Sequence, residues 1–278
     1  MTTLAVRHAT TTTHPSAFDG IVCAVDGAAG GEGAVAAAIA LAPSAAWLEV
    51  VCVGAGADSL EERRGRQALA AARLLATERG VAAATEVVHG ADAAGALLAR
   101  AGAQSLLVAA GRAPEPRRRG LDIGPLATAL VARAAGPVLV ARAHPAGAPR
   151  ILAAVDDGDG ARAVARLAGL VAVGCGGFVH LVHAAGQGYG PATRHRLAEL
   201  ATDLIALTGA EPVVDIAVGM QPAARICDLA RVFESSLVVV GRRSRGGLRS
   251  LGSVSERVAQ GAPCSVLVAP VTAPPRAA

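Results

Sequence analysis

Short apolar runs rich in valine, leucine and isoleucine alternate along the chain with longer segments whose apolar residues recur at helical spacing. Continuous apolar runs of this length are typical of strands buried on both faces of a sheet. We predict five strands in each half: residues 21–26, 47–53, 85–89, 106–110 and 138–142, then 150–156, 178–184, 213–218, 237–240 and 265–269. Between strands, two long helical segments end on glycines, Gly80 and Gly209, as helices commonly do.

The chain repeats itself. "IVCAVDG" returns as "ILAAVDDG", and "LVAAGR" returns as "LVVVGR", each 130 residues later. "VLVA" at Val138 recurs at Val266 after 128 residues, so the second copy has lost two residues after Gly241.

Strands alternating with helices predict an α/β fold of two tandem, doubly wound parallel five-stranded sheets that form a pseudo-dimer. We expect a disordered tail over residues 1–18, a first domain over 19–144, a link "AHPAGAP" and a second domain over 149–271.

The composition of the chain argues against some classes of binding partner. All 26 basic residues are arginine and lysine is absent, which a GC-rich coding sequence explains, so the net charge of +4 does not indicate nucleic acid. Aromatic residues make up 2% of the chain, too few for base-stacking surfaces. The longest apolar run is interrupted by Pro43 and Ser44, which argues against a membrane span. Five cysteines without a C-x-x-C pair are typical of core residues in a reducing cytoplasm, so we expect a cytoplasmic protein.

The segment "VVVGRRSRGGLRSLGSVSERV" combines a strand, an arginine-rich loop and a helix start. We expect Gly241 to let the chain turn sharply and Ser253 to cap the helix, with Glu256 completing a capping box. Free N–H groups at a helix start attract phosphate, and the loop arginines would add positive charge; these are Arg242, Arg243, Arg245 and Arg249. Parallel sheets bind ligands beyond their carboxyl ends, where Asp26, Asp156, Gly111 and Gly241 all fall.

These features resemble the universal stress protein family in its tandem two-domain form, over residues 20–270. The resemblance implies that the last strands of the two domains pair across their interface. In nucleotide-binding members, ATP is held by G-x2-G-x9-G-[S/T], with an aspartate after the first strand and an apolar residue at the end of the second contacting the adenosine end. Carried over to this chain, the cofactor-binding candidates are Asp156, Val182, Gly241, Ser244, Gly252 and Ser253.

Both copies depart from that motif. In the second, Ser244 replaces the middle glycine and only seven residues separate it from Gly252. In the first, Pro114 and Pro125 occupy the positions of the middle glycine and the final hydroxyl residue, and proline offers neither an N–H nor a hydroxyl group. Because proline suits a first helical position, we expect a helix start there that has lost its anion site.

Other candidate chemistry is weaker. His180 and His183 would point to opposite faces of a strand, so we expect core or edge histidines and not a metal pair. The acidic loop with Asp157 and Asp159 lacks the glutamate of an EF-hand, and we expect Mg²⁺ to arrive with the nucleotide. The sequence has no P-loop lysine and no G-x-S-x-G elbow, so we expect at most slow ATP hydrolysis.

Together these observations predict an ATP-binding stress-response or regulatory protein in which the second domain holds nucleotide. One alternative is a protein-interaction module of the same family that binds no nucleotide. Another is an enzyme such as an adenylyl transferase, whose H-x-G-H signature is absent. We expect ATP and an unidentified protein as partners, a homodimer of the tandem chain as one assembly, and neither nucleic acid nor membrane.

Overall fold

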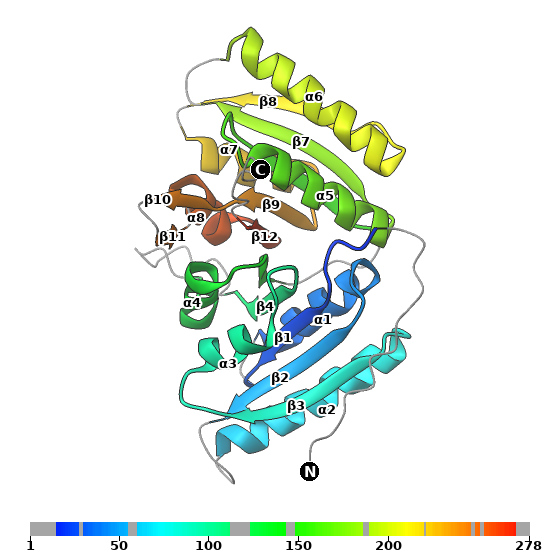
Figure 1. Ribbon diagram of the computed structural model, residues 1–278, viewed down its shortest axis with the longest axis vertical. Coiled ribbons are helices and arrows are strands. Elements are labelled where there is room, and N and C mark those ends of the chain that lie inside the picture. Colours follow the sequence, from blue (N-terminus) through cyan, green and yellow to red (C-terminus); the bar gives the residue numbers. More distant parts are fainter. Residues whose placement is uncertain are drawn as a thin grey trace, which may run out of the picture.

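The strands of the computed structural model form one continuous sheet of ten strands, in the order β3-β2-β1-β4-β5-β12-β9-β6-β7-β8 (Figure 1). The structure describes residues 15–27, 30–54, 60–111, 123–142, 148–185, 189–219, 221–245, 248–250 and 253–270. We call residues 15–142 the first half and 148–270 the second half. The strands of the first half are β1 (Ile21–Val25), β2 (Leu48–Gly54), β3 (Ala83–His89), β4 (Leu106–Ala110) and β5 (Val138–Ala141). Those of the second half are β6 (Arg150–Val155), β7 (Phe178–Ala185), β8 (Val213–Val218), β9 (Leu237–Gly241) and β12 (Ser265–Ala269).

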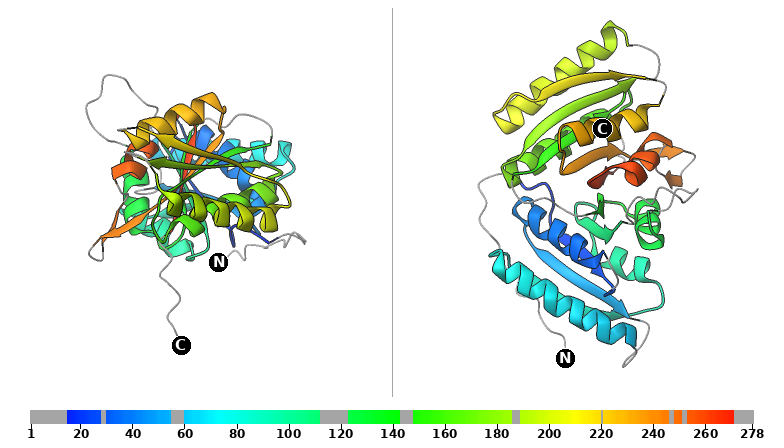
Figure 2. Two further views of the ribbon diagram at one scale, coloured as in Figure 1. Left: turned by 90° about the horizontal axis from the view of Figure 1, so that it is seen from above. Right: turned by 180° about the vertical axis from the view of Figure 1, so that it is seen from behind.

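Helices cover both faces of the sheet. The first face packs against α1 (Gly31–Leu41), α2 (Leu60–Glu78), α5 (Ala161–Cys175) and α6 (Pro191–Thr208). The second face packs against α3 (Ala93–Arg100), α4 (Pro125–Arg133), α7 (Pro222–Val232) and α8 (Ser253–Gly261). Seen from above in Figure 2, α6 and α7 lie on opposite sides of the strands. This is the layered arrangement that continuously apolar strands require.

The two halves join through their last strands. β5 and β12 pair antiparallel, with Leu139 opposite Leu267, whereas the strands within each half run parallel. The pairing that the family resemblance implied is therefore present, and it merges the two predicted five-stranded sheets into one. Because the pairing is antiparallel, the carboxyl ends of the first-half strands and those of the second-half strands lie on opposite edges of the sheet.

Most of the strands and helix ends predicted from the sequence agree with the structure. All ten predicted sheet strands are present, with bounds that differ by no more than two residues. The two long helices end as expected: Gly80 has a φ of 68° after α2, and Gly209 has a φ of 70° after α6. What the sequence pattern missed is a small hairpin, β10 (Arg243–Arg245) and β11 (Leu248–Ser250), which forms a separate two-stranded sheet.

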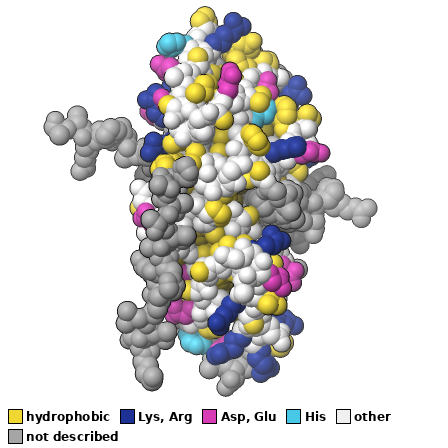
Figure 3. Space-filling model, turned by 90° about the vertical axis from the view of Figure 1, so that its right-hand side faces the viewer, with side chains coloured by type: hydrophobic (Ala, Val, Ile, Leu, Met, Phe, Trp, Pro, Cys, Tyr) yellow, Lys and Arg dark blue, Asp and Glu magenta, His cyan; other side chains and the backbone are white. Residues whose placement is uncertain are grey.

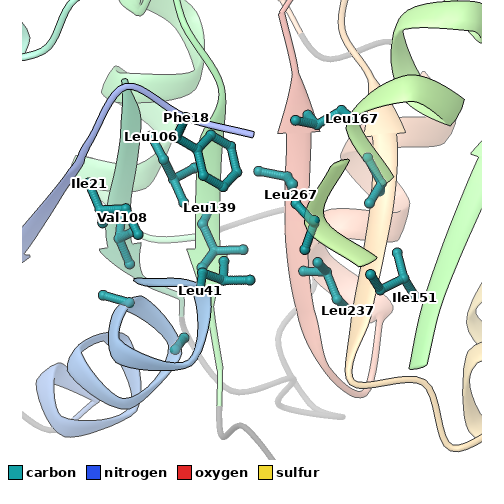
Figure 4. Close-up of a cluster of buried hydrophobic side chains, with 14 of the residues drawn as sticks. Phe18, Ile21, Leu41, Leu106, Val108, Leu139, Ile151, Leu167, Leu237 and Leu267 are labelled. Carbon is teal, nitrogen blue, oxygen red and sulfur yellow. The ribbon is translucent and has the colours of Figure 1, made fainter. Parts of the chain in front are cut away.

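One hydrophobic core extends from the first half into the second. Figure 4 shows Phe18, Leu106 and Leu139 on one side of the junction facing Leu267 and Leu237 on the other. Phe18 is only 1% exposed, and its amide donates to the Ser44 carbonyl oxygen at 3.0 Å. The chain is therefore packed from at least Phe18 onward, one residue before the predicted start of the first domain.

The five cysteines are free thiols, and four of them are buried: Cys23, Cys52, Cys227 and Cys264. Burial raises the thiol pKa of Cys23 and of Cys264 to about 12, because a thiolate loses its hydration in an apolar interior. Cys175 is partly exposed and lies 2.9 Å from the Ser44 hydroxyl. Four of the cysteines thus serve as small core residues, as the sequence predicted.

On the face drawn in Figure 3, arginines and carboxylates are interspersed, so the net positive charge is not gathered into one patch there. None of the helices in the described ranges is both long and apolar enough to cross a bilayer.

Candidate functional site

Asp156 and Gly241 lie on neighbouring strands at one edge of the sheet. β6 and β9 pair in parallel with Ala154 opposite Val240, so Asp156 leaves β6 just beyond the level at which Gly241 ends β9. Asp156 is exposed, and its Oδ1 accepts a hydrogen bond from the Gly158 amide at 2.9 Å. The structure therefore brings the predicted aspartate and the first loop glycine together at the carboxyl ends of β6 and β9.

The start of α8 is tied to the end of β9. Ser255, in the first turn of the helix, donates its hydroxyl hydrogen to the Gly241 carbonyl oxygen at 2.7 Å. This bond brings the first turn of α8 to the edge where Asp156 lies. Ser255 was not among the predicted residues. Its place in the sequence, two positions after the expected helix start and close behind a glycine loop, could have marked it as a candidate.

The loop between β9 and α8 differs from the expected open turn. Gly241 does not have a positive φ; it is the last residue of β9 and pairs with Ala269. The chain then forms the β10–β11 hairpin, in which Ser244 lies opposite Arg249. Two consecutive glycines between short polar strands are a recognised hairpin signal, whereas from the sequence we expected only a flexible loop here.

Val182 lies in the core and not at this edge. It is 0% exposed and is followed by three more residues of β7, so the strand ends beyond it at Ala185. Ala184 lies on the same face and is partly exposed. The prediction for Val182 ended the strand β7 one residue early. In addition, the alternation of side chains along a strand does not show which residue of one face is exposed to solvent.

Three predicted residues are not fully placed by the structure. Gly252 lies outside the described residues, and of Ser244 and Ser253 only the backbone course is described. Ser253 is the first residue of α8, and Glu256 lies in the first helical turn.

Arg242 differs most from the expectation. We expected it to add positive charge around a bound phosphate. Instead its side chain is 5% exposed, and its guanidinium donates to backbone carbonyls of the first half. The positive charge of Arg242 therefore lies at the end of α4 and not at the position expected for a phosphate.

The two histidines of β7 lie on opposite faces, as predicted. His180 Nε2 lies 2.7 Å from Asp215 Oδ2, and its ring meets the Phe233 ring edge-on. His183 Nε2 lies 3.8 Å from Asp157 Oδ2. Within the described residues there is no group of three or more side chains suited to hold a metal ion.

A comparison with protein-family models matches residues 148–270 to the universal stress protein family. The second half belongs to the universal stress protein family. The assignment agrees with the aspartate after β6, the glycine at the end of β9 and the helix start beside them.

Solved structures extend the likeness to the whole chain at the level of the fold. A universal stress protein from Archaeoglobus fulgidus DSM 4304 superposes with a TM-score of 0.69 at 18% identity, covering 92% of this chain and 97% of its own. A putative universal stress protein from Pseudomonas aeruginosa UCBPP-PA14 gives 0.67 at 20% identity, covering 91% and 93%. An A. fulgidus universal stress protein in complex with dAMP gives 0.37 at 25% identity, covering 44% and 98%. No curated protein matches the chain.

The first half has the same strand order as the second half, but different residues at the start of the helix that precedes its last strand. Gly124 has a φ of 96° and precedes α4, which begins at Pro125. The predicted helix start is therefore confirmed, with proline where the universal stress domain has Ser253. Pro114 lies outside the described residues.

Two hollows among the described residues lie away from this edge. One lies between α5 and α6 and includes Arg162, Asp203 and Leu207. The other lies between α7 and α8 and includes Cys227, Arg231 and Arg257. Neither is lined by Asp156, Gly241 or Ser255.

Proposed function

We propose that the chain is an ATP-binding regulatory or stress-response protein whose nucleotide site is the carboxyl edge of β6 and β9 in the second half. The observation that carries this proposal is the convergence of Asp156, Gly241 and the first turn of α8 at one edge, with Ser255 joining the last two. The resemblance to nucleotide-binding universal stress proteins supports ATP as the ligand.

Each group has a physical role in this proposal. The first turn of a helix leaves amides without a partner inside the helix and carries the positive end of the helix dipole, so the start of α8 would favour a phosphate group. Asp156 would accept hydrogen bonds from the adenosine end of the nucleotide. Ala184, on the α7 face of β7, would be the apolar residue at the adenosine end in place of Val182. Mg²⁺ would arrive on the phosphates, because their oxygen atoms are ligands that this ion prefers.

The first half has a structural role in the proposal. Its helix start has Pro125 where the second half has Ser253, and proline offers neither an N–H nor a hydroxyl group to a phosphate, so we expect the first half to bind ATP poorly or not at all. The two halves act as diverged copies, one carrying the site and one supporting it.

The β10–β11 hairpin favours a second candidate function. In a hairpin, part of the backbone is paired within the loop itself, which leaves fewer amides for phosphate. An interaction module that recognises a protein partner without nucleotide would tolerate such a loop.

Isothermal titration calorimetry with ATP separates the two functions. Wild-type protein should release or absorb heat on binding, and Gly252→Asp should abolish it, because a carboxylate at the helix start repels phosphate. Gly102→Asp is the matched control: it adds the same charge at an exposed position of the first half and should bind as wild type does. No heat from the wild type would refute the ATP proposal and leave the interaction module.

A further inference from the structure

The Arg242 side chain connects the candidate nucleotide loop to the first half of the chain. Its Nη1 donates to the carbonyl oxygens of Val131 and Ala134 at 2.7 and 2.9 Å, and its Nη2 donates to that of Gly136 at 3.2 Å. These acceptors lie 106 to 111 residues away in sequence. The side chain is 5% exposed, so the contacts are shielded from water.

The acceptors lie at the end of α4 and just beyond it: Val131 is in the last turn, Ala134 directly follows the helix, and Gly136 lies two residues further along. α4 ends at Arg133, so the carbonyls of its last turn have no partner within the helix. They also form the negative end of the helix dipole, which favours a cation. A planar guanidinium can donate to several carbonyls at once, whereas the ammonium of a lysine acts as a single point charge.

Other contacts hold the same loop. Arg242 directly follows Gly241, whose carbonyl oxygen is held by the Ser255 hydroxyl. The second strand of the hairpin, β11, packs against α4, and the two lie side by side in Figure 1. The start of the loop is thus fixed on one side by its own half and on the other by the first half.

We propose that Arg242 is a positioning residue that anchors the nucleotide loop on α4, so that the first half sets the geometry of the site in the second half. This inference rests on the proposed ATP function for its ligand, but the anchoring itself does not require nucleotide. It assigns the first half a defined role, because α4 is then the fixed support against which the shortened loop is held.

Arg142 offers a matched comparison. It is 8% exposed and donates to the carbonyl oxygens of Cys264, Ala259 and Gln260 near the end of α8. Both arginines therefore cap the end of a helix in the other half, and both are buried. Only Arg242 belongs to the nucleotide loop.

Two measurements test the proposal. The first is hydrogen–deuterium exchange without nucleotide: Arg242→Ala should speed exchange both in the hairpin, residues 243–250, and in residues 128–136 at the end of α4. The second is calorimetry with ATP: Arg242→Ala should weaken binding by about tenfold or more relative to Arg142→Ala, with the two variants compared at equal folded fraction.

Arg242→Lys distinguishes an anchor from a phosphate ligand. If the guanidinium fork is needed for the α4 carbonyls, lysine should leave binding weak and exchange fast. Full recovery of ATP binding in Arg242→Lys without slower exchange at α4 would show that Arg242 contacts phosphate directly, and would overturn the proposal.

The outcomes separate the two proposals. Faster exchange in both segments supports the anchor even if the wild type binds no ATP. Absence of ATP binding in the wild type would overturn the proposed function and with it the nucleotide role of Arg242. Unchanged exchange in either segment, or equal ATP affinity in Arg242→Ala and Arg142→Ala, overturns the positioning role.

Discussion

The guanidinium of Arg142, which directly follows β5 in the first half, donates to the carbonyl oxygen of Ala259 in α8 of the second half at 2.6 Å. The backbone of Arg142 adds to this link, because its amide donates to the Ser265 hydroxyl at 3.0 Å. Such contacts bind the halves through polar groups as well as through the shared core. Separating the halves would therefore break both kinds of contact.

Arg142→Ala should lower the free energy of unfolding by about 2–3 kcal/mol, because it removes charge-assisted hydrogen bonds and leaves buried carbonyls unpaired. Burial lowers the pKa of the Arg142 guanidinium, which is the desolvation cost that those bonds offset. Urea denaturation measures the change. Arg150→Ala is the control: its ion pair with Glu234 is largely exposed, so the loss should stay under about 1 kcal/mol. Equal losses in the two variants would contradict the capping role.

Leu267→Ala should destabilise both halves together. Leu267 is fully buried in the core that the halves share, and such truncations cost about 2–5 kcal/mol. Trp47 is the only tryptophan and lies in the first half, so its fluorescence follows that half alone. The Trp47 transition should move to lower urea together with the circular dichroism signal, although the substitution is in the second half. Val213→Ala, at a position 58% exposed, should move neither.

Asp156→Ala should weaken ATP binding by about tenfold, the loss of one hydrogen bond to the ligand. Calorimetry measures the affinity. Asp159→Ala removes an equal charge from the same exposed loop and should bind within about twofold of wild type. If Asp159→Ala weakens binding as much as Asp156→Ala, the effect is one of general charge and Asp156 does not contact the ligand.

Val182→Ala should affect stability and leave ATP affinity unchanged. Val182 is 0% exposed, so removing two methyl groups should cost about 2 kcal/mol. Thermal unfolding and calorimetry on the same sample measure both quantities. A clear loss of ATP affinity in fully folded Val182→Ala would show that the side chain does reach the nucleotide, as the family resemblance implied.

Stability should fall as pH rises from about 9 to about 12. Burial raises the pKa of the Cys23 and Cys264 thiols to about 12, above the ordinary thiol value of 9.0, so in this range the unfolded chain loses these protons while the folded chain keeps them. Each thiol then lowers the free energy of unfolding by up to about 1.4 kcal/mol per pH unit. Urea titrations at a series of pH values measure the slope. The double variant Cys23→Ala, Cys264→Ala should show a shallower slope, and an unchanged slope would refute the assignment.

The sequence alone determined the repeating units of this protein. Apolar runs located the ten sheet strands, glycines located the ends of α2 and α6, and Pro125 located the start of α4, because each of these signals acts over a few neighbouring residues. The repeat also placed Asp156 and Gly241 at one edge, since parallel strands end together.

Only the tertiary structure decided what those units contact. Val182 is excluded from the edge by the residues that cover it, and Arg242 is drawn from the expected phosphate site to α4 by carbonyls more than a hundred residues away in sequence. Neither fact has a local signature, because burial and hydrogen-bond partners depend on which surfaces meet when the halves join at β5 and β12. Periodicity reports which face of an element is apolar, and packing alone determines what that face and its flanking loops will touch.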